Sequence, residues 1–161
     1  MPMIVVFDMD NTLVDELGKT VRPGMPALLS RLRRDGVTLI LWTSSTRQRA
    51  RIMLSEHGLD HHFSRFVFRE DYDPRNQGLV KDIRTVNGDF LVDDDPKHVD
   101  FVRSVGREAF LIGTYRGDSS LDGGELERLY RRIKGVALRK KLFGWVRRVS
   151  FGLLRGSRPG I

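Results

Sequence analysis

Residues 5–14 read VVFDMDNTLV, an apolar run that ends in two aspartates one residue apart. The run begins at Met3 and is short, unbroken and rich in β-branched side chains, which predicts a buried strand rather than a helix. A strand that is buried on both faces is typical of a parallel sheet covered by helices on both sides. Ligands bind such sheets at the carboxyl ends of the strands. The sequence therefore places Asp8 at a ligand-binding edge, with Asp10 just beyond it.

The two aspartates suggest chemistry as well as position. Carboxylates this close repel each other unless a proton or a cation neutralises one of them. Mg²⁺ prefers oxygen ligands and leaves room for a substrate phosphate. A carboxylate beside such a phosphate can attack the phosphorus and form an aspartyl-phosphate. The competing interpretation is that Asp8 and Asp10 form a polar turn after a strand.

The rest of the chain alternates between strand and helix patterns. Further strands are predicted at 37–42, 66–68, 89–92 and 109–112. Helices are predicted at 27–34, 46–56, 97–105 and 122–133, and residues 70–78 read as a polar loop. Strands that alternate with helices are joined by right-handed crossovers, so the predicted fold class is α/β with a mainly parallel sheet.

Length and composition exclude several classes of protein. A chain of 161 residues suits one domain with a sizeable core. It contains no cysteine, which excludes disulfides, thiol catalysis and cysteine-bound zinc. No apolar run is long enough to span a bilayer, and the N-terminus lacks the pattern of a signal peptide. A cytoplasmic location is therefore expected.

The positive charge is confined to the C-terminal end of the chain. The net charge is +7, but residues 1–130 contain 18 Lys and Arg against 21 Asp and Glu, a balance of −3. Residues 131–161 contain the other 10 Lys and Arg and no acidic residue. We therefore divide the chain into a main domain, residues 1–134, and a basic amphipathic tail, residues 135–161.

Other polar residues follow predicted strands or apolar segments, as Asp8 does. They are Thr43 with Ser44, Lys81, and Asp93 with Asp94. Each has a simpler interpretation, namely helix caps, a solvated surface lysine and an acidic surface turn. Their common placement at one edge of the predicted sheet favours a shared site instead.

These residues also carry a resemblance to a known family. Residues 8–13, DMDNTL, resemble the first motif of the haloacid dehalogenase superfamily of phosphotransferases, and the other polar positions resemble its later motifs. The resemblance implies a three-layer, Rossmann-like core. It also implies that Asp8 is the nucleophile and that Asp10 is the general acid and base. The main-chain carbonyl of Asp10 would in addition touch a bound Mg²⁺.

The later motifs supply phosphate and metal contacts in this resemblance. Thr43 and Ser44 would bind the transferring phosphoryl group beside the N–H groups at a helix start. Lys81 would neutralise charge on the phosphate and on the nucleophile. Asp94 would join Asp8 and Asp10 as a metal ligand, and Asp93 would support it and is the second choice of ligand.

Shorter segments resemble one branch of the superfamily, the NLI-interacting-factor-like phosphatases. They are VRPG at 21–24, LWTSS at 41–45, FVFRE at 66–70, VKDI at 80–83 and VDDDP at 92–96. That branch contains small phosphatases that act on phosphoserine in the carboxy-terminal tail of RNA polymerase II. The resemblance, which covers about residues 3–112, implies a Mg²⁺-dependent phosphatase that acts on a phosphoprotein or another large substrate.

Many members of the superfamily carry a cap domain at one of two places. Here the corresponding segments, residues 13–21 and 82–92, are too short to hold one. An open site without a cap would admit a phosphorylated chain or a nucleic-acid end, whereas small-molecule enzymes often close over their substrate. The alternative functions are a nucleic-acid 3′-phosphatase, which the basic tail favours, and a non-catalytic binding module recruited through the tail.

The tail has an amphipathic pattern of its own between residues 136 and 154. One helical face gathers apolar side chains, namely Leu138, Leu142, Trp145, Val146, Val149 and Leu153. The basic side chains lie mostly elsewhere, which suggests a helix on an anionic membrane surface. Nucleic acid is the rival partner, because Lys and Arg contact phosphates. A third interpretation is packing on the protein's own domain or on a second subunit, so peripheral membrane binding and oligomer formation both stay open.

Overall fold

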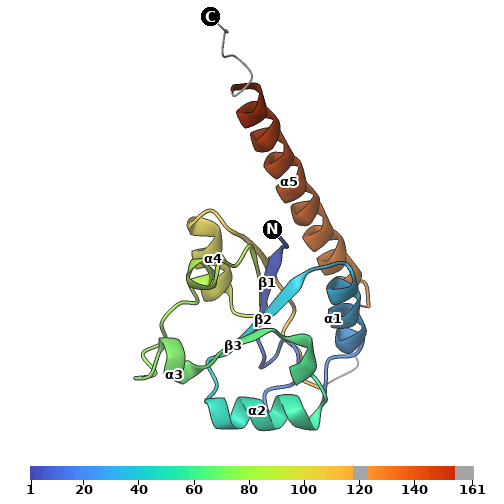
Figure 1. Ribbon diagram of the computed structural model, residues 1–161. Helices are drawn as coiled ribbons and strands as arrows, with labels where there is room; N and C mark the ends of the chain where they lie inside the picture. Colours follow the sequence, from blue (N-terminus) through green and yellow to red (C-terminus); the bar gives the residue numbers. More distant parts are fainter. Residues whose placement is uncertain (118–122, 155–161) are drawn as a thin grey trace, which may run out of the picture.

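The protein is built on a five-stranded parallel sheet (Figure 1). The computed structural model describes residues 1–117 and 123–154, and residues 147–154 through their backbone alone. The strands lie in the order β3-β2-β1-β4-β5, and every neighbouring pair is parallel. Their bounds are β1 Ile4–Phe7, β2 Thr38–Trp42, β3 Arg65–Val67, β4 Phe90–Asp93 and β5 Glu108–Leu111. The predicted α/β fold with a parallel sheet is confirmed.

Helices cover both faces of this sheet and make three layers. One face packs against α1 Met25–Arg34, α2 Arg47–Glu56 and α5 Glu125–Leu154. The other face packs against α4 Pro96–Ser104 and the 3-10 helix η2 Ile83–Val86. Two short helices complete the fold, α3 Arg69–Tyr72 and the 3-10 helix η1 Asp60–His62.

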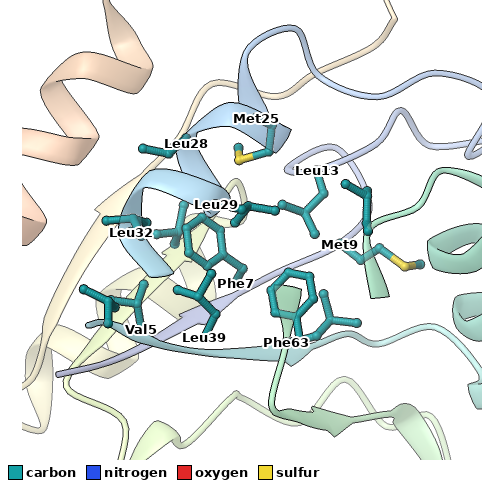
Figure 2. Close-up of a cluster of buried hydrophobic side chains, with 14 of the residues drawn as sticks. Val5, Phe7, Met9, Leu13, Met25, Leu28, Leu29, Leu32, Leu39 and Phe63 are labelled. Atoms are coloured by element: carbon teal, nitrogen blue, oxygen red, sulfur yellow. The ribbon is translucent and has the colours of Figure 1, made fainter. Parts of the chain in front are cut away.

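The central strand β1 is buried on both faces, as its unbroken apolar sequence predicts. Val5 and Phe7 belong to the core on the α1 side, whereas Val6 belongs to the core on the α4 side, as the period of two along a strand requires. Figure 2 shows Phe7 of β1 beneath the leucines of α1 and close to Phe63. The rings of Phe7 and Phe63 meet edge to face with centroids 6.5 Å apart.

The register of the sheet brings three strand ends together. Phe7, the last residue of β1, lies level with Leu41 of β2 and with Val92 of β4. The N–H of Asp8 then donates to the carbonyl of Val92 at 2.9 Å. The residues that directly follow β1 and β2 therefore lie beside Asp93, the last residue of β4. They meet at the carboxyl ends of the three central strands.

Most predicted bounds agree with the structure to within two residues, and three differences have a physical reason. The third strand ends at Val67, one residue earlier than predicted, because Phe68 is the N-cap residue of α3, whose single turn begins at Arg69. Residues 70–78 were expected to be loop throughout, but α3 occupies the first part of this segment. The Asp71 carboxylate accepts from the N–H of Phe68 at 2.9 Å and so stabilises the turn. A helix of four residues is too short to show an apolar period in the sequence.

The third difference is the last helix, which was predicted at 122–133. The structure has one continuous α5 that begins at Glu125 and ends at Leu154, so it runs through the proposed boundary at 134/135 and through Gly135 and Gly144. The division into residues 1–134 and 135–161 stays a prediction. Its last part, residues 155–161, lies outside the described residues.

Within the described residues no cap domain is inserted. Residues 13–21 form a short loop in which Val14 makes isolated bridges to Asp10 and to Val21. Residues 82–92 hold only η2 and the start of β4. The predicted absence of a cap therefore agrees with the structure.

One buried carboxylate holds the loop at residues 15–20. Asp15 Oδ1 accepts from the N–H of Leu17 at 2.9 Å, and Oδ2 accepts from the N–H and the hydroxyl of Thr20, each at 2.6 Å. Burial opposes the charge of Asp15, but the hydrogen bonds, those of Thr20 foremost, outweigh it and lower the pKa of Asp15 to about 2. The loop therefore depends on the ionised form of Asp15.

We expect Asp15→Asn to lower the free energy of unfolding by about 1–2 kcal/mol at neutral pH, because an amide loses charge-assisted hydrogen bonds. The folded-state pKa lies below the value of about 3.9 that an unfolded chain shows. Ionised Asp15 therefore contributes stability above about pH 4, and this contribution is lost as the pH falls toward the folded-state pKa.

Urea unfolding of wild type and Asp15→Asn at a series of pH values measures this effect. The difference between the two proteins should shrink as the pH falls below about 4. Glu16→Gln removes a carboxylate from the exposed neighbour and should change the stability little. A difference for Asp15→Asn that stays constant with pH would contradict the role of the charge.

Candidate active site

All but one of the predicted site residues line one cavity at the carboxyl ends of the strands, and the exception is Thr43. Its volume is about 310 Å³. The predicted residues among its lining are Asp8, Asp10, Ser44, Lys81, Asp93 and Asp94. The cavity is also lined by Asn11, Asp95, Pro96 and His98, which are not among the predicted site residues; Asp95 was named from the sequence only as a residue that the run of three aspartates makes hard to tell from Asp93 and Asp94.

Lys81 lies at the centre of this cluster. The residue is 1% exposed, and Nζ lies 2.6 Å from Asp8 Oδ1 and 2.7 Å from Asp93 Oδ2. Burial alone would lower the pKa of Lys81, but the charges of the two carboxylates outweigh it and raise this pKa above its ordinary value. Lys81 is therefore a buried ammonium group that bridges two strand ends.

The carboxylates outnumber the ammonium group. Oxygens of Asp8, Asp93 and Asp94 all lie within 4.8 Å of one another. Burial foremost, and then the charge of Asp93, raise the pKa of Asp8 well above its ordinary value despite the contact with Lys81. The same two causes raise the pKa of Asp94. The cluster is therefore short of positive charge.

This shortage fits a divalent cation. Three ionised carboxylates and one ammonium group leave a net charge of −2, which Mg²⁺ would neutralise.

The hydrogen bonds also distinguish the two neighbouring aspartates. Asp93 accepts from Asp95 N–H with Oδ1 and from Lys81 with Oδ2, so both of its oxygens are engaged, whereas Asp94 accepts through Oδ2 from the hydroxyl of Thr114 at 3.1 Å. This difference favours Asp94 over Asp93 as the ligand, which stays a prediction.

Asp10 is held apart from the cluster by an arginine. Arg49 of α2 places Nη2 2.8 Å from Asp10 Oδ1 and Nη1 3.0 Å from Asp10 Oδ2. The same guanidinium donates to Ser45 Oγ and to the carbonyl of Glu16. The Asp10 carboxylate is thus oriented by Arg49, and the predicted contact of its carbonyl with a metal is untested.

Thr43 and Ser44 play different parts in the structure. The Thr43 side chain is fully buried, and Oγ1 accepts from the N–H of Ser45 at 3.0 Å. It therefore shapes the turn that leads into α2, whose N-terminus Thr46 caps by accepting from Arg49 N–H. Ser44 is exposed and lines the cavity. The predicted phosphate contact of both hydroxyls stays a prediction, and Ser44 is the one placed on the cavity wall.

The structure adds residues that sequence reasoning missed. Arg22 is buried and donates from Nε to the carbonyl of Thr12 at 2.7 Å and from Nη2 to the carbonyls of Asn11 and Gly113. It fixes the turn after Asp10, where Asn11 adopts a left-handed backbone with φ of 60°. The only signal for Arg22 was its place in the VRPG segment. No spacing pointed to Arg49, since α2 carries three arginines at alternate positions.

We expect Arg49→Met to lower kcat for a small aryl phosphate by about 10- to 100-fold, because the carboxylate of Asp10 loses the group that orients it. Arg51→Met is the matched control, since Arg51 lies on the same helix but does not line the cavity. Initial rates of both variants against wild type measure the effect. Equal rates for Arg49→Met and Arg51→Met would show that the orientation of Asp10 does not depend on Arg49.

Comparison with known proteins tests the fold and the family. A search of curated protein sequences gives no match. A haloacid dehalogenase-superfamily hydrolase from Ehrlichia chaffeensis is 14% identical, with 84% of this chain and 97% of that chain covered and a TM-score of 0.61. A haloacid dehalogenase-like hydrolase from Xanthomonas campestris is 10% identical, with 86% and 97% covered and a TM-score of 0.62.

A third solved structure is D,D-heptose 1,7-bisphosphate phosphatase from B. bronchiseptica, in complex with magnesium and phosphate. It is 13% identical, with 83% of this chain and 98% of that chain covered and a TM-score of 0.54. At these identities the likeness concerns the fold, and it confirms the Rossmann-like core of the haloacid dehalogenase superfamily.

The sequence model of NLI interacting factor-like phosphatases matches residues 3–142. The match includes every predicted site residue and the first part of α5, and it confirms the resemblance seen in the shorter motifs. Because it covers far more than half of the chain, this protein belongs to the NLI interacting factor-like phosphatase family, and it is a phosphatase.

Proposed function

We propose that the protein is a Mg²⁺-dependent phosphomonoester hydrolase that works through an aspartyl-phosphate on Asp8 and acts on a phosphorylated macromolecule, foremost a phosphoprotein. The main support for this reaction mechanism is the charge balance of the site. Asp8 and Asp93 contact the ammonium group of Lys81, and Asp94 lies close to both carboxylates, so the cluster leaves two negative charges for a divalent cation. Asp8, Asp94 and the Asp10 carbonyl would hold this cation. When bound, Mg²⁺ supplies positive charge that offsets the repulsion between the nucleophile and the phosphate.

The residues divide the reaction between them. A carboxylate oxygen of Asp8 attacks the phosphorus, so that the new bond forms as the bond to the leaving oxygen breaks. Asp10 gives its proton to the leaving oxygen. Asp10 then takes a proton from the water that attacks the phosphorus of the aspartyl-phosphate, and inorganic phosphate is released. Lys81 stabilises the charge that gathers between Asp8 and the phosphoryl group.

A second cavity supports the proposal of a large substrate. It has a volume of about 780 Å³ and is lined by Arg47, Arg51 and Arg65 together with aromatic side chains. Trp42 and Val80 also line it, and these residues are chain neighbours of Thr43 and Lys81. A substrate that reaches beyond the phosphate would therefore meet cationic side chains. The segment between Phe68 and Lys81 also forms part of this wall, through Asp71, Tyr72 and Leu79.

The position of this cavity favours a phosphoprotein over a nucleic acid. Arg65 and Val67 belong to β3, which is the edge strand of the sheet and pairs with β2 alone. An extended peptide can add to such an edge through its backbone, whereas a nucleic acid cannot. One observation supports the nucleic-acid alternative. The Arg51 guanidinium lies over the rings of Phe66 and Phe68, 5.6 and 5.3 Å from their centroids. A nucleic-acid base can stack on such an arrangement of aromatic and arginine side chains.

The proposal is tested by hydrolysis of p-nitrophenyl phosphate, with Mg²⁺ and with EDTA, followed by phosphopeptides and 3′-phosphorylated oligonucleotides. We expect hydrolysis that requires Mg²⁺ and a value of kcat/KM for the best phosphopeptide at least about 100-fold above that for the aryl phosphate. Arg65→Met should lower kcat/KM for the peptide and leave the aryl phosphate unchanged. Absence of Mg²⁺-dependent hydrolysis would refute the enzymatic proposal. Preference for the oligonucleotide would mean that the substrate is a nucleic acid and not a phosphoprotein.

A further inference from the structure

Helix α5 carries two apolar stripes on opposite sides. Its first half packs on the domain with three buried side chains, Leu129, Ile133 and Val136. Leu138, Leu142 and Trp145 each follow one of these residues by nine positions. Nine residues are two and a half turns of a helix with about 3.6 residues per turn. The second stripe therefore points away from the domain on which the first stripe packs.

The exposure of the side chains agrees with this geometry. Leu138 is 59% exposed, Leu142 56% and Trp145 65%, and Val146 beside them is 51% exposed. We call these four residues the outer stripe. Half of the ten large apolar side chains that are strongly exposed in the described residues lie between positions 138 and 146. Packing on the protein's own domain, one of the three interpretations from the sequence, is therefore wrong for the outer stripe. Val149 and Leu153 lie outside the residues whose side chains are described.

The charge around the outer stripe is of one sign. Residues 131–161 contain 10 Lys and Arg and no acidic residue. The basic side chains on the inner side of α5 reach acids of the main domain, as Lys140 does with Asp89 at 2.6 Å and Arg139 with Glu108 at 3.0 Å. Lys141 is exposed and lies three positions after Leu138, at the border of the outer stripe. An apolar stripe flanked by cations is the pattern of a helix that lies in a membrane interface.

We propose that α5 binds an anionic lipid membrane through the outer stripe, with the apolar side chains below the headgroups and the basic side chains against lipid phosphates. Trp145 has the amphipathic ring that is enriched at this depth. None of the described helices is long and apolar enough to cross a membrane, so the proposed contact is with the surface. This proposal does not depend on the proposed substrate.

The same observations disfavour the two rival partners. A second copy of the chain packed on the outer stripe would bring two segments of +10 together, with no acid in residues 131–161 to pair with them. A nucleic acid would satisfy the basic side chains but leave Leu138, Leu142 and Trp145 in water. An anionic bilayer accounts for both the charge and the apolar surface.

The direction of α5 also suits this role. Lys140 Nζ lies 3.3 Å from the carbonyl of Pro2, just before β1, and 2.6 Å from Asp89, just before β4. The helix therefore passes the amino ends of the strands at this point and projects beyond them (Figure 1). The active site lies at the carboxyl ends. A membrane bound by the outer stripe would leave the active site facing the water.

Flotation of the full chain with vesicles tests the proposal. The vesicles are phosphatidylcholine alone or phosphatidylcholine with about one-third phosphatidylserine. We expect binding to the anionic vesicles and little to the neutral ones. Leu142→Glu and Trp145→Glu should each weaken binding by more than about tenfold, since each places a charge where an apolar side chain is buried in the interface. Ile52→Glu, an equally exposed apolar position on α2, is the matched control and should bind like wild type.

All variants should keep the melting temperature and the aryl phosphatase rate of wild type, because these side chains are exposed and do not line the active-site cavity. Absence of binding to anionic vesicles would overturn the proposal, and so would binding that Leu142→Glu and Trp145→Glu leave unchanged. Sedimentation velocity that shows a dimer lost in Leu142→Glu would assign the outer stripe to a second copy. Binding to DNA that is tighter than binding to vesicles, and is lost in the same variants, would assign it to nucleic acid.

Discussion

Asp8→Asn is expected to lower the hydrolysis of p-nitrophenyl phosphate by at least about 10³-fold, because an amide cannot attack phosphorus to form the covalent intermediate. The substitution keeps the size of the side chain. It also keeps an oxygen that can accept from Lys81, which donates to Asp8 Oδ1 at 2.6 Å. Steady-state rates at saturating Mg²⁺ measure the loss. Acid quenching during turnover should leave a base-labile phosphoryl group on wild type and none on the variant.

The stability of Asp8→Asn separates a chemical role from a structural one. Burial and Asp93 raise the pKa of Asp8, so removing this charge relieves repulsion inside the cluster. We therefore expect a melting temperature at or above that of wild type without Mg²⁺, together with a smaller stabilisation by added Mg²⁺. A variant that melts well below wild type would mean that activity was lost through the fold. A variant that keeps more than about a tenth of the activity would assign the nucleophile elsewhere.

Lys81→Met is expected to have the largest effect on stability. It removes the only ammonium group between two buried carboxylates, which lie 2.6 and 2.7 Å from Nζ. Loss of one partner from a buried ion pair costs about 3–5 kcal/mol, because the remaining charges are left without compensation. We expect the free energy of unfolding to fall by this amount without Mg²⁺, and the aryl phosphatase rate to fall by more than about 100-fold.

Three comparisons make the Lys81 prediction specific. Added Mg²⁺ should raise the melting temperature of Lys81→Met more than that of wild type, since the variant cluster carries one more negative charge. The double variant Lys81→Met with Asp93→Asn should regain part of the stability and none of the activity. Lys19→Met, at an exposed position, controls for the loss of a surface charge. Equal stability of Lys81→Met and Lys19→Met would contradict the importance of the buried bridge.

The strands and most of the site could be predicted because both depend on local sequence. A strand buried on two faces must be an apolar run, so the position of β1 follows from residues 3–7. Asp8, Thr43 and Asp93 lie at the ends of such runs, and parallel pairing brings these ends together, whereas Lys81 lies in an irregular segment before η2. The segments at residues 13–21 and 82–92 are too short for a cap domain, and their lengths could also be taken directly from the sequence.

The residues that could not be predicted act over long distances. Arg49 is 39 positions from Asp10, and the target of its flexible side chain depends on how α2 packs. Arg22 reaches the carbonyl of Gly113, 91 positions away. The outer stripe of α5 could be seen in the sequence, but its direction could not. That direction depends on which side of the helix the domain covers.

The order of the strands has a consequence for the synthesis of the protein. β1 is the first strand in the chain but lies in the middle of the sheet, between β2 and β4. A growing chain can pair β1 with β2 once residue 42 has emerged, whereas the partner on the other side ends at residue 93. Until then one edge of β1 stays open and the carboxylate of Asp8 is far from both Lys81 and Asp93. The crowding of charge in the catalytic site can therefore arise only after residue 93 has emerged, when β1, α1 and β2 are already available to form part of the apolar core beside it.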